Sequence, residues 1–386
     1  MTTNARTDDE WSRPETAVMA DMRDALSEGR DAVVATIAAV EGSAYRRPGA
    51  KMLVDGDGAV GSITAGCLED EVVALARSVL ETGRPRLERF DLTDDEEWGL
   101  GLGCNGVIDL LLEPLDDRFE RLLDRYAAGE NGLALTVVEA PEDGDLAVGD
   151  RAYAPDGDLA AGDRSNGDPL PEWLVDEVAD AATEYYERGE SATVEVAGPE
   201  GSVRVFVDPV LAPPELYVFG SGNDAAPVSE LAAAAGFRVT VVAFRGGRAD
   251  PEAFPAADRV VAASAPRIGE ELDFDDETYA VVMSHNFVDD RMAVEALLDT
   301  PVPYIGAMGP ESRFERMREA FIEEDRPLTD ADLDRLYAPI GLDLGGGAPY
   351  QIATSIVSEV LAVHNERSPG HLRERKSPIH GRSPSE

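Results

Sequence analysis

The pattern of hydrophobic and polar positions changes near the middle of the chain. From residue 215 onward, short apolar runs rich in β-branched residues alternate with segments of helical spacing. This alternation predicts an open parallel sheet with helices on both faces. The expected strands are 216–219, 238–243, 259–262, 279–283 and 303–305, and the expected helices are 225–235, 289–298, 311–321 and 349–364.

The N-terminal half has a mixed pattern that predicts an α+β arrangement. A helix is expected over 15–28, because apolar residues recur at helical spacing and Gly29 follows as a C-cap signal. A β-branched run over 31–40 predicts a strand, and two apolar runs around an Asp-Gly-Asp-Gly turn predict a hairpin. Further helices are expected at 68–80, 119–128 and 171–188, and further strands at 107–113, 133–139, 192–196 and 202–207.

Composition and patterning together divide the chain into four regions. Residues 15–115 form an N-terminal α+β domain, and 215–365 form a Rossmann-like parallel-sheet domain, so the fold class is α/β. Between them, 116–212 is a middle region whose segment 140–171 is rich in Asp, Gly and Pro and is interpreted as an acidic insertion or linker. Residues 366–386 are expected to form a disordered tail.

The charge balance restricts the class of partner. The chain has 34 basic and 77 acidic residues, a net charge of −43, and its only lysines are Lys51 and Lys376. Acidic residues recur along the whole chain, which is typical of a surface solvated in a salt-rich cytoplasm, and we therefore expect a halophilic source. At ~1 M salt the Debye length is about 3 Å, so self-repulsion is screened. No basic stripe is present to bind nucleic acid.

Location follows from what the sequence lacks. Two cysteines make no disulfide framework. The polar first 14 residues carry no apolar signal core. No apolar run reaches the ~20 residues that span a bilayer. A cytoplasmic protein without a membrane partner is expected.

A glycine-rich turn, Gly220-Ser-Gly222-Asn223-Asp224-Ala225, lies directly between an expected strand and an expected helix. In this context the first glycine makes the turn, the second lets the backbone approach a phosphate, and the third position allows close helix–strand packing. The next strand ends Ala243-Phe244-Arg245, without the acidic residue that binds the ribose of NAD. Arg245 favours another phosphate-bearing ligand, or NADP. A turn that binds nothing is the alternative.

Three further loops are candidates for the same crevice, because ligands of open α/β sheets bind beyond the carboxyl ends of the strands. His285 follows the fourth strand and either donates to a phosphate or oxo ligand or is a capping or turn histidine. Gly306 and Gly309 lie in the passage after the fifth strand, where Arg313 can face an anion. Asp343 either faces the crevice, caps the last helix or belongs to a tight turn.

Both cysteines lie in glycine-containing segments of the N-terminal half. Cys67 precedes an expected helix and is near Arg46 and Arg47 in sequence, and Cys104 precedes an expected strand. A thiolate binds soft metals or acts as a nucleophile, and its pKa falls beside arginine or at a helix N-terminus. The alternative is a small buried hydrophobic residue. Without Cys-x-x-Cys spacing, a zinc site is not expected.

Four segments together resemble the XdhC/CoxI family: 42–51, 61–69, 101–106 and most of 216–362. The resemblance implies a homodimeric, non-catalytic chaperone that binds molybdopterin-based molybdenum cofactor, protects it, supports its sulfuration and inserts it into a molybdenum hydroxylase like xanthine dehydrogenase. A cysteine desulfurase is an implied second partner. Family patterns differ from this chain at Ala65, Asn105 and Asn286, but none of these differences removes a thiol or His285.

The motifs and the resemblance together give one set of expected binding residues. For the cofactor these are Arg46, Arg47, Cys67, Cys104, Gly220, Gly222, Asn223, Asp224, Ala225, Arg245, His285, Gly306, Gly309 and Asp343, with Cys104 as the expected molybdenum contact. Two other functions are open. One is an NAD(P)-dependent oxidoreductase that uses the 220–225 turn. The other is a direct subunit of the hydroxylase, although without the cysteine clusters that hold iron–sulfur centres no redox role of its own is expected.

Overall fold

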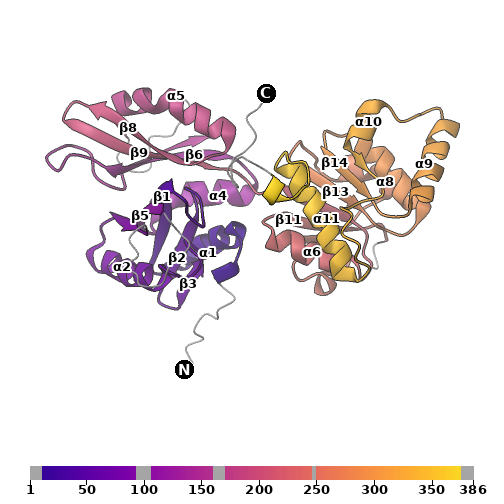
Figure 1. Ribbon diagram of the computed structural model, residues 1–386, viewed down its shortest axis with the longest axis horizontal. Helices are drawn as coiled ribbons and strands as arrows, with labels where there is room; N and C mark the ends of the chain where they lie inside the picture. Colours follow the sequence, from indigo (N-terminus) through magenta and orange to yellow (C-terminus); the bar gives the residue numbers. More distant parts are fainter. Residues whose placement is uncertain (1–10, 93–105, 160–169, 246–248, 375–386) are drawn as a thin grey trace. The chain divides into compact units, whose positions relative to one another are not determined.

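The computed structural model describes residues 11–92, 106–159, 170–245 and 249–374. The chain divides into two compact units, Met1–Pro213 and Pro214–Glu386 (Figure 1). A six-stranded parallel sheet lies in the second unit, and two antiparallel sheets lie in the first. The α/β fold class expected from the sequence is therefore confirmed.

The parallel sheet of the second unit has the strand order β12-β11-β10-β13-β14-β15. The chain enters at the central strand β10, adds two strands on one side, and then returns to add three on the other. This order reverses between β10 and β13, which is the switch point of a Rossmann-type sheet. The strands are β10 (Glu215–Phe219), β11 (Arg238–Ala243), β12 (Arg259–Ala262), β13 (Thr278–Val282), β14 (Tyr304–Ala307) and β15 (Leu336–Tyr337).

Helices cover both faces of this sheet (Figure 1). Leu216 and Val218 of β10 pack toward α6 (Ala225–Ala234) and α11 (Pro349–His364). Tyr217 and Phe219 pack toward α8 (Phe287–Leu298) and α9 (Glu311–Glu323). Because both faces are buried, the strand is an uninterrupted apolar run. Shorter elements are η4 (Pro251–Ala253), η5 (Ala265–Arg267), α7 (Ile268–Glu271), α10 (Asp330–Arg335) and η6 (Leu372–Glu374).

The five-stranded sheet of the first unit has the order β3-β2-β1-β5-β4. Successive residues of its central strand face opposite sides. Val33, Ala35 and Ile37 pack toward α2 (Glu69–Thr82). Val34 packs toward α1 (Glu15–Glu28) and α4 (Glu120–Ala128), which η2 (Asp117–Phe119) precedes. The strands are β1 (Ala32–Gly42), β2 (Lys51–Asp55), β3 (Gly58–Gly61), β4 (Arg86–Asp91) and β5 (Gly106–Pro114).

The four-stranded sheet of the first unit has the order β7-β6-β9-β8, and α5 (Glu172–Arg188) covers it. Its edge strand β7 falls inside 140–171, the segment that its composition indicated to be an insertion or linker. Pairing with β6 makes these residues a strand despite the flanking turn residues. The strands are β6 (Gly132–Glu139), β7 (Arg151–Pro155), β8 (Ala192–Gly198) and β9 (Gly201–Val210). In the described parts of the chain, no helix has the length and apolar character needed to cross a membrane.

A buried ion pair joins the two sheets of the first unit. The Nζ of Lys51 on β2 lies 2.8 Å from Oδ2 of Asp208 on β9, and the two side chains are only 5% and 7% exposed. Nζ also donates to the carbonyl of Gly49, and the hydroxyl of Ser191 donates to Asp208 Oδ1. Burial lowers the pKa of Lys51, but the neighbouring carboxylates outweigh it, so the net pKa is raised. Both charges are therefore satisfied away from water.

Removing one member of this pair should strongly destabilise the first unit, because the other charge is left buried and unpaired. We expect Lys51→Met to lower the free energy of unfolding by about 3–5 kcal/mol. Denaturant unfolding in concentrated salt measures the change. The matched control is Arg188→Gln in the exposed pair Arg188–Glu184, where both side chains are 58% exposed and a change below about 1 kcal/mol is expected. Equal effects of the two substitutions would contradict the prediction.

Candidate functional site

The glycine turn after β10 and the loop after β13 lie against each other at the carboxyl edge of the sheet. Gly220 has a φ of +154°, and a Cβ there would lie 2.5 Å from the carbonyl oxygen of Met283. The amide of Met283 donates to the carbonyl of Phe219, and the amide of Gly220 donates to that of Val242. The expected crevice loops are therefore neighbours, and only glycine fits at position 220.

An Asp–His pair connects these two loops. Nε2 of His285 lies 2.7 Å from Oδ2 of Asp224. An ionised carboxylate can only accept, so Nε2 carries the proton and Nδ1 is left for another partner. Asp224 stands at the N-cap of α6, but its side chain makes no capping hydrogen bond. A Cβ at Gly222 would lie 2.6 Å from Asp224 Oδ1, so the bare glycine makes room for the carboxylate.

His285 has an unusual backbone conformation. Its φ is +61°, in the left-handed region that non-glycine residues seldom adopt. Such a conformation costs on the order of 1–3 kcal/mol and persists only where the surroundings impose it. Its imidazole is 58% exposed, so it is available to a ligand. Of the sequence-based alternative of a capping or turn histidine, the capping part is wrong, because Asn286 accepts the amides of Val288 and Asp289 at the start of α8. The positive φ of His285 is that of a turn residue.

A buried carboxylate fixes the loop that carries His285. Oδ1 of Asp290, a residue only 2% exposed, accepts both the amide and the hydroxyl of Ser284. Its Oδ2 accepts from Nη2 of Arg313 on α9 at 2.5 Å. The Arg313 guanidinium that the sequence placed near an anion thus serves Asp290. Asp290 was not predicted, because an aspartate in the first turn of a helix has no distinct sequence signal.

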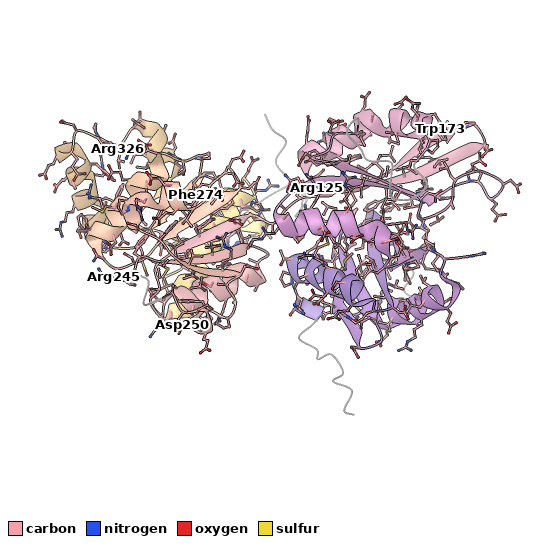
Figure 2. All side chains as sticks on the ribbon, turned by 180° about the vertical axis from the view of Figure 1, so that it is seen from behind. Arg125, Trp173, Arg245, Asp250, Phe274 and Arg326 are labelled. Atoms are coloured by element: carbon pink, nitrogen blue, oxygen red, sulfur yellow. The ribbon has the colours of Figure 1, made fainter. Side chains whose placement is uncertain are left out.

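Arg245 is an exposed cation at this edge of the sheet. Figure 2 shows it at the outer surface of the second unit; its side chain is 70% exposed, and Nη2 lies 3.5 Å from Oδ2 of Asp289. The preceding residue, Phe244, stacks on Phe219 with ring centroids 6.0 Å apart. The end of β11 therefore offers an aromatic ring and a guanidinium where an NAD site offers a carboxylate.

Local packing explains why glycine occurs at position 306, within β14, and at position 309, just after it. A Cβ at Gly306 would lie 2.3 Å from Cδ1 of Ile340 inside the sheet. Gly309 has a φ of +139°, and a Cβ there would lie 2.5 Å from Cδ of Arg313. Close packing therefore accounts for both, and the cofactor-binding role expected for them stays a prediction.

Asp343 lies on an exposed loop that is held by a hydrogen bond to a buried carboxylate of α11. Oε2 of the buried Glu359 on α11 accepts the Tyr304 hydroxyl at 2.7 Å and the Gly341 amide at 2.8 Å. Burial, with the nearby Glu359 charge, holds the pKa of Tyr304 well above its usual value. Asp343 does not cap α11, because Gln351 accepts the amides at the start of that helix, at Gly347 and Ala348. The capping interpretation of Asp343 is therefore wrong.

In the first unit, a carboxylate organises the loop that carries Cys67. Glu69 accepts the amide and hydroxyl of Thr64, the amide of Leu68 and the indole N–H of Trp11. The Thr64 hydroxyl oxygen in turn accepts the amide of Cys67 at 3.1 Å. Burial raises the pKa of Glu69, but these hydrogen bonds outweigh it and the net pKa is lowered. Glu69 was missed from the sequence as a residue that shapes this loop.

Of the expected binding residues in the first unit, Arg46, Arg47 and Cys67 lie among the described residues. Cys67 is partly exposed and its side chain packs against the apolar cluster under α2. Nη1 of Arg46 lies 3.2 Å from the Ser62 hydroxyl, and Nη2 lies 3.6 Å from Glu15. Arg47 is exposed. Cys104, and with it the expected molybdenum contact, lies outside the described residues.

The second unit thus assembles Gly220, Gly222, Asn223, Asp224, Ala225, Arg245 and His285 at one edge, while Arg46, Arg47 and Cys67 belong to the first unit. No cluster of three or more His, Cys, Asp or Glu side chains suited to a metal ion occurs in the described ranges. The edge offers an imidazole, a carboxylate, a guanidinium and close backbone. These groups suit a polar organic ligand that carries an anionic group better than a bare metal ion.

Comparison with known proteins identifies two matching family descriptions. The description "XdhC and CoxI family" matches residues 15–91, and "XdhC Rossmann domain" matches residues 216–360. The second match spans β10 to most of α11, and therefore every loop of the crevice described above.

Individual relatives agree with these matches. A Bacillus subtilis protein named as a probable xanthine dehydrogenase subunit is 29% identical over 348 residues, covering 88% of this chain and 96% of the relative. A crystal structure of a xanthine dehydrogenase from Bacillus halodurans has a TM-score of 0.70 at 27% identity, covering 92% of this chain and 96% of that one. The molybdenum cofactor insertion chaperone PaoD of Escherichia coli is 32% identical over 118 residues, 28% of this chain and 36% of PaoD.

The hydrogen bonds of Glu69 should make the Cys67 loop sensitive to acid. Because the folded pKa of Glu69 is lowered from 4.5, its stabilisation is present above the unfolded pKa and is lost as the pH falls through the folded pKa. We expect Glu69→Gln to lower the free energy of unfolding by about 1–2 kcal/mol at pH 7, and the difference from wild type to be smaller at an acid pH well below 4.5.

Denaturant unfolding at both pH values tests this expectation. Labelling of Cys67 in a Cys104→Ser background gives a second readout, because a loosened loop exposes the thiol. Glu71→Gln is the matched control, since Glu71 lies in the same first turn of α2 but is exposed. A difference between Glu69→Gln and wild type that stays constant at acid pH would refute the prediction.

Proposed function

This chain belongs to the XdhC and CoxI family, and on that premise we propose that it binds molybdenum cofactor as cargo and delivers it to a molybdenum hydroxylase of the xanthine dehydrogenase type. The observation that carries the proposal is the presence of both family regions in one chain, together with similarity to a relative that is named as a molybdenum cofactor insertion chaperone. A maturation role accounts for both without requiring a reaction of its own.

The geometry of the crevice supports a phosphate-bearing cargo. Molybdopterin carries a phosphate, and the exposed Arg245 guanidinium at the end of β11 matches a phosphate in charge and in its forked donors. His285, whose Nε2 is committed to Asp224, has Nδ1 left for the cofactor. We propose that the remaining expected binding residues, which include Gly306, Gly309 and Asp343, also contact the cofactor.

The proposal also gives a role to the two cysteine thiols. We propose that Cys67 and Cys104, together with Arg46 and Arg47, handle the molybdenum end of the cofactor while a sulfido ligand replaces an oxo ligand. A cysteine desulfurase supplies the sulfur in this scheme, and the chain acts as a homodimer in a salt-rich cytoplasm. Partial exposure of Cys67 at a loop before α2 supports access to that thiol.

A permanent component of the hydroxylase is a second candidate function, favoured by the name of the Bacillus subtilis relative, a probable xanthine dehydrogenase subunit. An NAD(P)-dependent oxidoreductase has less support, because the end of β11 presents Phe244 and Arg245 instead of a carboxylate. Size-exclusion chromatography with the hydroxylase distinguishes the first two functions. A permanent component stays bound after cofactor transfer, and a chaperone dissociates.

Cargo binding is tested on protein from a host that makes molybdopterin, purified in concentrated salt. Molybdenum is measured by mass spectrometry and released pterin by fluorescence, for wild type, Cys104→Ser and Arg245→Gln. We expect close to one pterin per chain in wild type, a loss of molybdenum in Cys104→Ser, and weaker pterin retention in Arg245→Gln, because a phosphate contact is removed.

Arg326→Gln is the matched control, since it also removes a surface guanidinium, one that pairs with Asp299. It should retain pterin like wild type. Absence of pterin from all variants, with a nicotinamide retained instead, would overturn the chaperone proposal and favour the oxidoreductase.

A further inference from the structure

The Asp224 carboxylate stands where a dinucleotide would place its pyrophosphate. In dinucleotide-binding sheets the pyrophosphate lies over the second glycine of the turn, at the N-terminus of the following helix. Here the second glycine is Gly222, and a Cβ on it would lie 2.6 Å from Oδ1 of Asp224. The space that this glycine normally keeps free for a phosphate is therefore occupied by a negatively charged oxygen of the protein itself.

The carboxylate is held in that place from the neighbouring loop. Nε2 of His285 lies 2.7 Å from Oδ2 of Asp224, and His285 keeps a φ of +61° to reach it. Ser284, the preceding residue, is bound through both its amide and its hydroxyl to the buried Asp290. Because Asp290 fixes the loop that carries His285, the hydrogen bond from His285 holds Asp224 over the turn. Asp224 therefore does not cap its own helix.

Among the described residues, two guanidiniums of this edge pair with carboxylates other than Asp224. Nη2 of Arg245, two residues after β11, lies 3.5 Å from Oδ2 of Asp289 in the first turn of α8. Arg313 is directed to Asp290. An anion placed over Gly222 would therefore meet a carboxylate at contact distance, and like charges in such a juxtaposition are strongly unfavourable. Oδ1 of Asp224 has no hydrogen-bond donor among the described residues, and it suits a ligand N–H.

We propose that Asp224 determines the ligand specificity of the glycine turn. It excludes the pyrophosphate of NAD(P), and it accepts N–H groups from an uncharged heterocycle, such as the amino-pyrimidinone edge of a pterin. The exclusion of dinucleotides stands on the geometry alone, whereas the pterin contact rests on the proposed function. Cofactor cargo then lies with its pterin over Gly222 and its phosphate toward Arg245.

Three probes separate these statements: NADPH, inorganic pyrophosphate and 6-hydroxymethylpterin. Each is titrated against wild type, Asp224→Asn and Asp224→Ser, in salt at which circular dichroism shows each variant folded. Asp224→Asn keeps the shape and removes the charge, and Asp224→Ser also empties the space. Asp299→Asn is the matched control, because it removes a carboxylate of the same unit just beyond the far end of α8.

For wild type and the control, we expect no saturable NADPH or pyrophosphate binding below about 1 mM, and measurable binding of the pterin. In Asp224→Ser, NADPH and pyrophosphate should bind about tenfold tighter or more, and pterin affinity should fall by a similar factor. In Asp224→Asn the change should have the same direction but be smaller, because an amide still fills the space and keeps one acceptor.

NADPH affinity that is the same in wild type and both folded variants would overturn the exclusion by Asp224. Pterin affinity that does not change in Asp224→Ser would overturn the pterin contact. These outcomes are distinguishable from failure of the proposed function: a gain of NADPH binding in the variants, with no molybdenum cofactor in purified wild type, supports the exclusion and removes only the cargo assignment.

Discussion

The close approach of the glycine turn to the loop after β13 is the constraint on which the candidate site depends. Reversal of the strand order at β10 makes β13 its neighbour, and Gly220 then passes so near the Met283 carbonyl that no side chain fits. That proximity lets Asp224 reach His285 across the switch point. A Rossmann-type sheet brings these loops together whatever its ligand, so the ligand is decided by the side chains placed there.

Buried charge is handled in the same way throughout this very acidic chain. Asp290 is buried at the switch-point loop and paired with Arg313, and Lys51 is buried with Asp208 between the sheets of the first unit. Glu69 gathers four hydrogen bonds around the Cys67 loop. Asp290 and Glu69 in this way hold the segments that carry His285 and Cys67. The acidic surface and these internal carboxylates therefore have different physical roles.

The two units carry different chemical groups. Partly exposed Cys67 lies in the first unit, and the imidazole, carboxylate and guanidinium lie at the sheet edge of the second. One family description matches a segment of the first unit, and the other matches a segment of the second unit. A chain that only oxidised or reduced a substrate with NAD(P) would need an open glycine turn. The described turn is covered by Asp224 instead.

The sequence by itself determined the class of the fold and the position of the crevice. Alternating strands and helices after residue 215, and a glycine turn directly after the first strand, are local patterns, and local patterns can be recognised without a structure. For the same reason, Gly220, Arg245 and His285 were placed at one edge before their contacts were known. The two-residue strand β15 and the edge strand β7 could not be recognised, because pairing with β14 and β6 defines them and no periodicity does.

Only the tertiary structure decided what the polar residues do. Asp224 has the sequence position of a helix cap and instead pairs with a histidine 61 residues away. Glu359 and Asp290 look like ordinary helix carboxylates, yet they anchor the Asp343 loop and the His285 loop. A hydrogen bond or ion pair across elements depends on which strands are neighbours and on which face of a helix is buried. These relations arise from packing between distant segments, and no local stretch of sequence encodes them.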